Sequence, residues 1–309
     1  MRVAFSDEAT RLSSSDHRVV LLSGDIGNRL FEPFKKQNGE RFFNCGVAEA
    51  NMMGVASGMA LSGLRPIVYT ITPFTTTRCY EQIRVDACYH NVPVTIVGTG
   101  SGLCYAELGP THHSCEDLAI MRMLPNMTVL APADEVELRQ CLRAALQQSG
   151  PVYIRIGKKG EAVTPKRSDD FEIGRSITVR DGSDVCLLST GILLPTVMQA
   201  ADELSALGVS VRVESFHTVK PLDYGTLSEV FSSYSVVGVV EEHNKNGGLG
   251  GSVAEWLSSQ PPMKGRMISF GTGDEFMHEV GSQSYARKKY GLTAENICRE
   301  IFTANEQKR

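Results

Sequence analysis

The sequence contains no long apolar segment and no excess of basic residues. Proline, glycine or charged residues interrupt every apolar run before it reaches the ~20 residues that a membrane-spanning helix needs. The formal net charge of −4 at pH 7 excludes a broad basic surface for nucleic acid. The N-terminal residues also lack the apolar core of a signal peptide. These absences predict a soluble cytoplasmic protein.

The chain also lacks the cysteine spacing of metal and redox motifs. Its eight cysteines are scattered, none in a Cys-x-x-Cys pair, and several lie in apolar runs. A thiol in such a run behaves as a small buried side chain, so we expect free thiols in a reducing compartment. Glu241, Glu242 and His243 are adjacent but do not have the spacing of zinc ligands. No metal site within this chain is predicted.

The first half of the sequence alternates short apolar runs with helix-forming stretches. A polar opening helix to about residue 15 is followed by predicted strands at 19–22, 65–69, 92–97, 127–130 and 152–156. Helices are expected between them, at about 46–62, 78–88, 115–123 and 134–149. Strands that alternate with helices predict a parallel sheet covered on both faces.

A charged segment containing glycine and proline separates this half from a second one with the same rhythm. The second half has predicted strands at 184–189, 210–215, 234–240 and 266–270. Its helices are expected at about 193–207, 223–232, 248–259, 281–290 and 293–306. We therefore expect two α/β domains with parallel sheets, residues 1–157 and 176–309, joined by a linker over residues 158–175.

One carboxylate stands out in the stretch 44–63, where Glu49 is surrounded by glycine, alanine, valine, cysteine and methionine. It could be an ordinary first-turn acid, which the positive end of the helix dipole stabilises by about 0.3–1 kcal/mol. It could instead be a buried carboxyl with a catalytic role, because the small neighbours allow a flat ligand or another backbone to approach closely. The residues of this stretch alone leave both interpretations open.

Taken with the rest of the chain, this stretch resembles the pyrimidine-binding domain of the transketolase family of thiamine diphosphate enzymes. The family pattern Gly-x-x-Glu-x-x-x-x-Gly-x-Ala-x-Gly-x-Ala runs here from Gly46 to Ala60. Similarity continues through residues 73–84, 109–119 and 123–134, and residues 240–255 resemble the family's C-terminal domain. Because several motifs occur in the right order over nearly the whole chain, the resemblance implies these two domains in sequence.

The resemblance implies roles for particular residues. Glu49 would bind the cofactor and activate it through a hydrogen bond to N1′ of its aminopyrimidine. Phe74 would pack on the pyrimidine, with a core aromatic as its alternative, and Ile26 is a candidate to line the same pocket. His112 would act beside the reacting carbonyl in catalysis and substrate binding, with a structural pair of His112 and His113 as the alternative.

Two arginines are candidate substrate-binding residues. Arg78 could contact an anionic substrate or pair with Glu81, three residues later. Arg155 matches a position that binds the substrate phosphate in sugar-phosphate relatives, a role that suits a bidentate guanidinium. The alternative for Arg155 is an ion pair between domains.

Two positions depart from the pattern of sugar transketolases. The aspartate found four residues before the matching histidine is Leu108 here, and a further histidine twelve residues before it is Gly100. A leucine side chain cannot accept or donate a hydrogen bond, so the specificity of the site for an ordinary ketose phosphate should be weaker. The departures leave the substrate open.

A larger departure concerns the diphosphate half of the cofactor site. The family's Gly-Asp-Gly motif with a following Asn, which holds Mg²⁺ and the diphosphate, has no counterpart in this sequence. The resemblance therefore implies the C-terminal subunit of a split transketolase, inactive alone. A partner chain would hold most of the thiamine diphosphate and Mg²⁺, and an α₂β₂ assembly is expected.

The implied reaction is transfer of a two-carbon ketol unit from a ketose, such as a ketose phosphate, to an aldehyde. Two alternatives remain open. The chain could be a subunit of an enzyme that decarboxylates 2-oxo acids, similar to an E1 β subunit or to deoxyxylulose phosphate synthase. It could also be a non-catalytic scaffold, although a scaffold has no need of Glu49.

Overall fold

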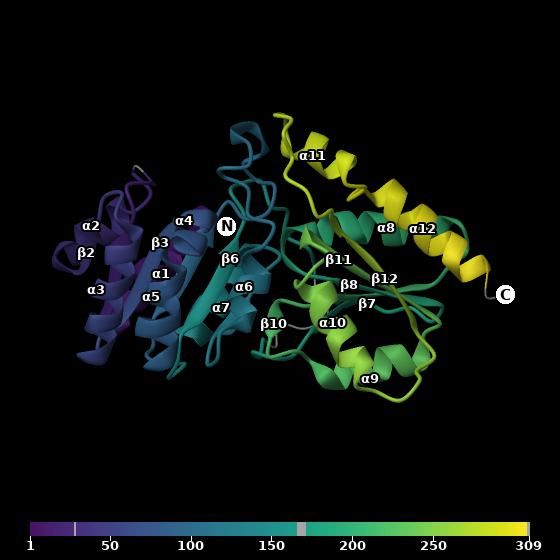
Figure 1. The fold of residues 1–309 in the computed structure, drawn as a ribbon, viewed down its shortest axis with the longest axis horizontal. Coiled ribbons are helices and arrows are strands. Elements are labelled where there is room, and N and C mark those ends of the chain that lie inside the picture. The colour runs from purple at the N-terminus through teal and green to yellow at the C-terminus, as the bar shows by residue number, and fades with distance from the viewer. Residues whose placement is uncertain (28, 166–170, 308–309) are drawn as a thin grey trace.

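The computed structural model describes residues 1–27, 29–165 and 171–307, which form two α/β units side by side (Figure 1). Residues 166–170 of the predicted linker lie outside the described residues. None of the helices in the described part of the chain combines the length and apolar character needed to cross a bilayer.

The first unit is built on a seven-stranded sheet with the order β10-β5-β6-β4-β3-β1-β2. Six strands come from the first half of the chain: β1 (Val19–Ser23), β2 (Phe42–Asn44), β3 (Arg65–Ile71), β4 (Thr95–Thr99), β5 (Thr128–Leu130) and β6 (Val152–Ile156). They run parallel to one another. The seventh strand, β10 (Thr218–Lys220), comes from the second half and pairs antiparallel with β5.

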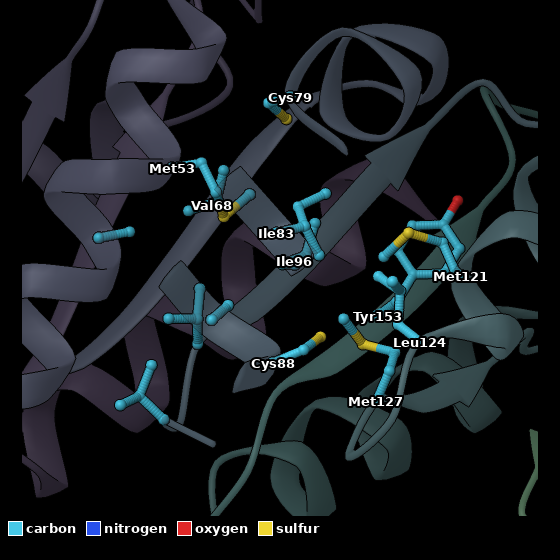
Figure 2. Packing of buried hydrophobic residues seen from close by; sticks show 14 of the residues in the cluster. Met53, Val68, Cys79, Ile83, Cys88, Ile96, Met121, Leu124, Met127 and Tyr153 are labelled. Carbon is cyan, nitrogen blue, oxygen red and sulfur yellow. The ribbon is translucent and has the colours of Figure 1, made fainter. Parts of the chain in front are cut away.

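Helices cover both faces of this sheet. Successive strand residues point to opposite faces, so Val20, Leu22 and Val68 enter one core while Val19, Leu21 and Ile67 enter the other. The first core contains residues of α3 (Glu49–Leu61), α6 (Asp117–Met123) and a π-helical segment (Ile83–Tyr89) that follows α4 (Thr72–Thr75) and α5 (Tyr80–Gln82). Figure 2 shows Met53, Val68, Ile83, Ile96 and Met121 in this core. The second contains residues of α1 (Arg2–Ser15), α2 (Glu32–Asn38) and α7 (Glu135–Ala145).

The second unit has a five-stranded sheet with the order β12-β11-β8-β9-β7. Its strands are β7 (Ile177–Arg180), β8 (Val185–Ser189), β9 (Val211–Ser215), β11 (Val236–Asn244) and β12 (Arg266–Thr272), and β7 is antiparallel to β9. One face packs against α8 (Leu194–Ala206) and α12 (Ala294–Glu306), the other against α9 (Tyr224–Ser233) and α10 (Leu249–Ser258). Along the chain, α11 (Gln283–Lys289) follows β12 and precedes α12. The predicted class, two α/β domains with mostly parallel sheets, is confirmed.

Candidate active site

The candidate residues gather where strands of the first sheet end. Parallel strands place their carboxyl ends at one edge of a sheet, which is where α/β folds bind ligands. Gly24 follows β1, Phe74 follows β3 and Gly100 follows β4. Glu49, at the start of α3, projects into the same region, because a Cβ on Gly24 would lie only 3.8 Å from its Oε1. The site is thus assembled from loops that are far apart in the sequence.

Glu49 is a buried carboxylate that pairs with an arginine. Its side chain is 4% exposed, and its Oε2 accepts a hydrogen bond from Nη1 of Arg78 at 2.9 Å. Arg78 also covers Phe74, with its guanidinium carbon 4.0 Å from the centre of the ring. The sequence predicts that Arg78 contacts an anionic substrate or pairs with Glu81. The structure pairs it with Glu49 instead, while Arg84 lies 3.6 Å from Glu81.

The residues around Glu49 fit an aminopyrimidine. The guanidinium of Arg78 is a flat group with N–H donors, and it already lies on the ring of Phe74 while it donates to Glu49. A pyrimidine that packs on Phe74 and hydrogen-bonds to Glu49 would use the same two contacts. Gly24, next to Glu49, has no side chain and no room for one, because a Cβ there would lie 2.8 Å from Oγ1 of Thr70. This side of the site can therefore accept a flat heterocycle with a ring nitrogen facing Glu49.

His112 lies beside Phe74, as the sequence predicts for two residues of one site. The two rings are 5.3 Å apart and nearly perpendicular. Nδ1 of His112 is 2.9 Å from Oγ1 of Thr111, and the side chain remains partly exposed. Its neighbour His113 is buried, and burial lowers the pKa of His113 below its usual value. The two histidines are therefore distinct: His112 is partly exposed, and His113 is buried.

Ile26 lies in the loop after β1 and is half-buried. It packs against the core that contains Phe31 and Tyr69, and its backbone N–H donates to the carbonyl of Gly24 at 2.7 Å. The loop around Gly24 borders Glu49, so Ile26 is near the site, but its contact with the cofactor stays a prediction.

Arg155 requires a correction. Its side chain is buried, and its Nε donates to Oδ2 of Asp117 at 2.8 Å. Its Nη2 donates to the backbone carbonyls of Ser114 and Glu242, at 3.0 and 2.7 Å. Burial disfavours its charge, but Asp117 more than compensates, and the pKa of Arg155 is raised above its usual range. The ion pair lies within the first domain, and not between domains as in the alternative left open by the sequence; the hydrogen bond to the Glu242 carbonyl is what reaches the second domain. The buried guanidinium is thus bonded to protein groups and is not exposed to a substrate phosphate.

Sequence reasoning missed Tyr105 and Lys158. The ring of Tyr105 lies 6.0 Å from that of His112, and Nζ of Lys158 is 4.4 Å from the centre of the Tyr105 ring. Lys158 also forms an ion pair with Glu107. The available signal was Gly100: its φ is +72°, and a Cβ there would lie 1.9 Å from Cε2 of Tyr105. A glycine in place of a histidine indicated that another side chain fills that space.

Within the described residues, no three His, Cys, Asp or Glu side chains cluster as a metal site would require.

The helix α3, which begins with Glu49, has an exposed outer face. Val55 and Gly58 lie on its outer face, and Val47 just before the helix is 77% exposed. A Cβ on Gly58 would meet nothing within 4 Å.

Comparisons with known proteins match both halves of the chain. Residues 1–160 match the model of the transketolase pyrimidine binding domain, and residues 174–297 match the model of the transketolase C-terminal domain. The chain belongs to the transketolase family. The predicted resemblance is therefore confirmed.

Two relatives of this transketolase-family chain are themselves named as subunits. The 6-deoxy-6-sulfo-D-fructose transketolase subunit SqwH of Clostridium sp. (strain MSTE9) is 35% identical over 309 residues, which cover 100% of this chain and 95% of the relative. One of the subunits of an apulose-4-phosphate transketolase from Phocaeicola vulgatus is 33% identical over 304 residues, which cover 96% and 95%. A solved structure, a split gene transketolase in an inactive beta4 tetramer, superposes with a TM-score of 0.90 at 35% identity, covering 100% and 99% of the two chains.

Proposed function

We propose that this chain is the C-terminal subunit of a two-chain transketolase that transfers a two-carbon ketol unit from a ketose to an aldehyde. The observation that carries the proposal is the buried carboxylate of Glu49, which contacts a flat nitrogen-bearing group lying on Phe74. The relatives named as transketolase subunits or as a split gene transketolase support the two-chain organisation. The division into residues 1–157, a linker over 158–175 and residues 176–309 belongs to the same proposal.

Thiamine diphosphate, when bound, supplies a nucleophilic carbon and an electron sink for cleaving the bond next to a ketone. In this proposal Glu49 holds a hydrogen bond at a ring nitrogen of the aminopyrimidine, and Phe74 packs on its face. His112 donates or accepts a proton at an oxygen of the substrate, as general acid–base catalysis requires. The rings of Phe74 and Tyr105 both lie beside this partly exposed imidazole, with centroids 5.3 and 6.0 Å from its own.

The partner chain would supply the ligands for the diphosphate and Mg²⁺. The outer face of α3 is the surface we propose for its docking, because Val55 is exposed there, Gly58 leaves open space, and Val47 just before the helix is exposed as well. The same helix begins with Glu49, so a chain docked on this face would complete the cofactor site. An α₂β₂ stoichiometry is a further part of the proposal. So is a cytoplasmic location, because eight free cysteines favour a reducing compartment.

The substrate is proposed to carry an anionic group at the end opposite its ketone. Lys158 is the candidate to bind it, since this partly exposed cation lies beside Tyr105, which in turn lies beside His112. It takes the role that sequence reasoning gave to Arg155. The two relatives are named for a sulfonated sugar and a sugar phosphate, and both compounds carry such a group.

Reconstitution tests the function. The chain is mixed with a candidate diphosphate-binding partner, thiamine diphosphate and Mg²⁺, and ketol transfer is followed with a panel of phosphorylated and sulfonated ketoses. We expect transfer from the pair and none from either chain alone. Full activity of this chain alone would overturn the two-chain proposal. Release of carbon dioxide from pyruvate without ketose cleavage would favour the decarboxylating alternative.

A further inference from the structure

His112 lies in a loop whose two ends are joined at its base. The backbone N–H of Gly102 donates to the carbonyl of Ser114, and the N–H of Ser114 donates to the carbonyl of Gly102, both at 2.9 Å. Residues 103–113, here called the histidine loop, lie between these ends. Next to His112 the loop makes a short turn, with the N–H of His112 donating to the carbonyl of Gly109 at 3.0 Å, while Glu107 pairs with Lys158 and Leu103 and Ala106 pack against Met277 and Ala286. The joined base is one of the supports that set the orientation of the loop.

Glu242 of β11, from the second domain, holds both ends of this loop. Its Oε1 accepts a hydrogen bond from the backbone N–H of Leu103 at 2.8 Å. Its own carbonyl accepts from Nη2 of Arg155 at 2.7 Å, and the same Nη2 donates to the carbonyl of Ser114 at 3.0 Å. Glu242 thus holds Leu103, the first residue of the loop, by a direct hydrogen bond. It holds Ser114, which closes the base, through the buried guanidinium of Arg155.

The end of β11 continues this attachment. The backbone N–H of Asn244 donates to the carbonyl of Cys115 at 2.7 Å. Nε2 of His243 accepts from the backbone N–H of Ala119, at 3.3 Å. Of the three adjacent residues that lack the spacing of zinc ligands, His243 thus binds the segment that follows the loop. Glu241 instead accepts hydrogen bonds from the backbone N–H groups of Leu249 and Gly250, at the start of α10.

The Glu242 carboxylate is itself fixed from the opposite side by α11. Nε2 of Gln283 donates to its Oε1 at 2.9 Å, and Arg287 forms an ion pair with its Oε2. The residue is 1% exposed. Gly102 allows this close approach, because its φ is +61° and a Cβ there would lie 2.6 Å from Oε1 of Glu242. A carboxylate held by three groups and packed on a glycine is a rigid support.

We propose that Glu242 is a positioning residue for His112, and that the C-terminal domain serves the reaction by holding the histidine loop in place. The inference rests on the proposed function, because His112 must act on the substrate for its position to matter. A displacement of about 1 Å in a catalytic group can lower a rate ~100-fold. Glu242 touches neither substrate nor cofactor and acts through the loop.

The first experiment measures the loop in the isolated chain. Hydrogen exchange of the amides of residues 103–113 is compared between the wild type and Glu242→Ala. We expect exchange in the loop to become at least ~10-fold faster, while the amides of β1 and β4 stay protected. The matched control is Glu255→Gln, which breaks another ion pair between the domains, with Arg122, that does not touch the loop. Equal protection of the loop in both variants would overturn the proposal.

The second experiment measures the reaction in the reconstituted pair. We expect kcat to fall ~10- to 100-fold in Glu242→Ala, and less in Glu242→Gln, which keeps an acceptor for the Leu103 N–H. A double-mutant cycle with His112→Asn separates positioning from general weakening. If Glu242 acts through His112, Glu242→Ala costs little more in the His112→Asn background. If the losses of kcat caused by Glu242→Ala and His112→Asn multiply in the double variant, the proposal is overturned.

The two experiments also separate this inference from the proposed function. If the wild-type pair transfers no ketol unit from any ketose, the function fails while hydrogen exchange still decides whether Glu242 holds the loop. If Glu242→Ala does not fold, Arg287→Gln serves instead, because it removes the ion pair from the partly exposed α11 side. A fully protected loop in Arg287→Gln, with unchanged kcat, would then contradict the proposal.

Discussion

Nη1 of Arg78 lies 2.9 Å from Oε2 of Glu49, so a carboxylate that is 4% exposed is paired with a cation that is 43% exposed. The two residues are 29 positions apart, one at the start of α3 and the other in a short 3₁₀ helix, Thr77–Cys79, that follows α4. Desolvating a carboxylate is costly unless a partner compensates. The guanidinium therefore offsets the burial of Glu49 in the free chain, at the contacts that a bound pyrimidine would take over.

Replacement of Glu49 by glutamine should abolish most of the activity of the reconstituted pair. The amide keeps the size of the side chain but loses the charge and the proton-accepting oxygen, and positioned acid–base groups contribute ~100- to 10,000-fold. We expect kcat to fall at least ~100-fold, measured by steady-state ketol transfer. Glu81→Gln, at a 68% exposed position, is the control. A Glu49→Gln rate close to that of the control would favour the scaffold alternative.

Removal of the Arg78 side chain should destabilise the isolated chain. Arg78→Ala leaves the buried carboxylate of Glu49 without its partner, which costs about 1–3 kcal/mol in the free energy of unfolding. Urea denaturation measures the change. The control, Arg84→Ala, breaks an ion pair between two exposed side chains and should change stability by less than about 1 kcal/mol. Equal losses in the two variants would show that the Glu49 contact carries no stability.

A side chain at Gly100 should be tolerated only if Tyr105 is replaced by a smaller residue. Gly100→Ala combines a positive φ, which costs about 1–2 kcal/mol for an L-residue, with a contact of 1.9 Å to the Tyr105 ring. Thermal unfolding should therefore show a lower midpoint, and the double variant with Tyr105→Ala should recover part of the loss. In Gly58→Ala, at an open helical position, stability should rise by about 0.5–1 kcal/mol. No recovery in the double variant would contradict the explanation.

The stability of the chain should depend on Glu8 at acid pH. Burial raises the pKa of Glu8, but hydrogen bonds from Arg143 and Arg11 outweigh it and lower the pKa to about 2 from 4.5. Because the folded pKa is the lower one, Glu8 stabilises the fold above pH ~4.5 and loses this contribution as the pH falls toward ~2. Urea midpoints across that range should fall less steeply in Glu8→Gln. The exposed Glu40→Gln should keep the wild-type slope.

Assembly should depend on the outer face of α3. Gly58→Arg fills space that is open in this chain, so the chain should fold while the partner is excluded. We expect its affinity for the partner to fall at least ~10-fold, equivalent to about 1.4 kcal/mol, by analytical ultracentrifugation of the mixture. Leu207→Glu, at a 55% exposed position in the second domain, is the control. Unchanged affinity in Gly58→Arg would exclude this face as the docking surface.

Most of the fold could be predicted because apolar runs and helix periodicity are local signals. The central strands β1, β3, β4 and β6 were expected near their observed bounds. The helices and strands that were missed are short or at sheet edges: α2, α4, β2, β7 and β10. The helix predicted at 78–88 is mostly π-helical, over Ile83–Tyr89. A three-residue strand such as β10 leaves no period to detect, since its pairing with β5 decides its structure.

The site could be predicted as far as motifs fix residue types. Glu49, Phe74 and His112 were expected in one site, and the structure brings Phe74 and His112 into ring contact. Arg78 and Arg155 pair differently, because their partners lie far away in the sequence: Glu49 for one, and Asp117 with Glu242 for the other. Which distant groups satisfy a guanidinium is set by tertiary packing, and no spacing in the sequence records it.

The order of synthesis gives β10 a further consequence. Its central residue, Val219, is buried in the core of the first unit, and its flanking residues pair with β5. β5 ends at Leu130 and β10 begins at Thr218, an interval that takes roughly 4–18 seconds to synthesise at ~5–20 residues per second. For that time β5 is an open edge on the nascent chain, able to pair with the same strand of a neighbouring chain on the polysome. Slow passage of the ribosome through residues 131–217 should therefore favour aggregation.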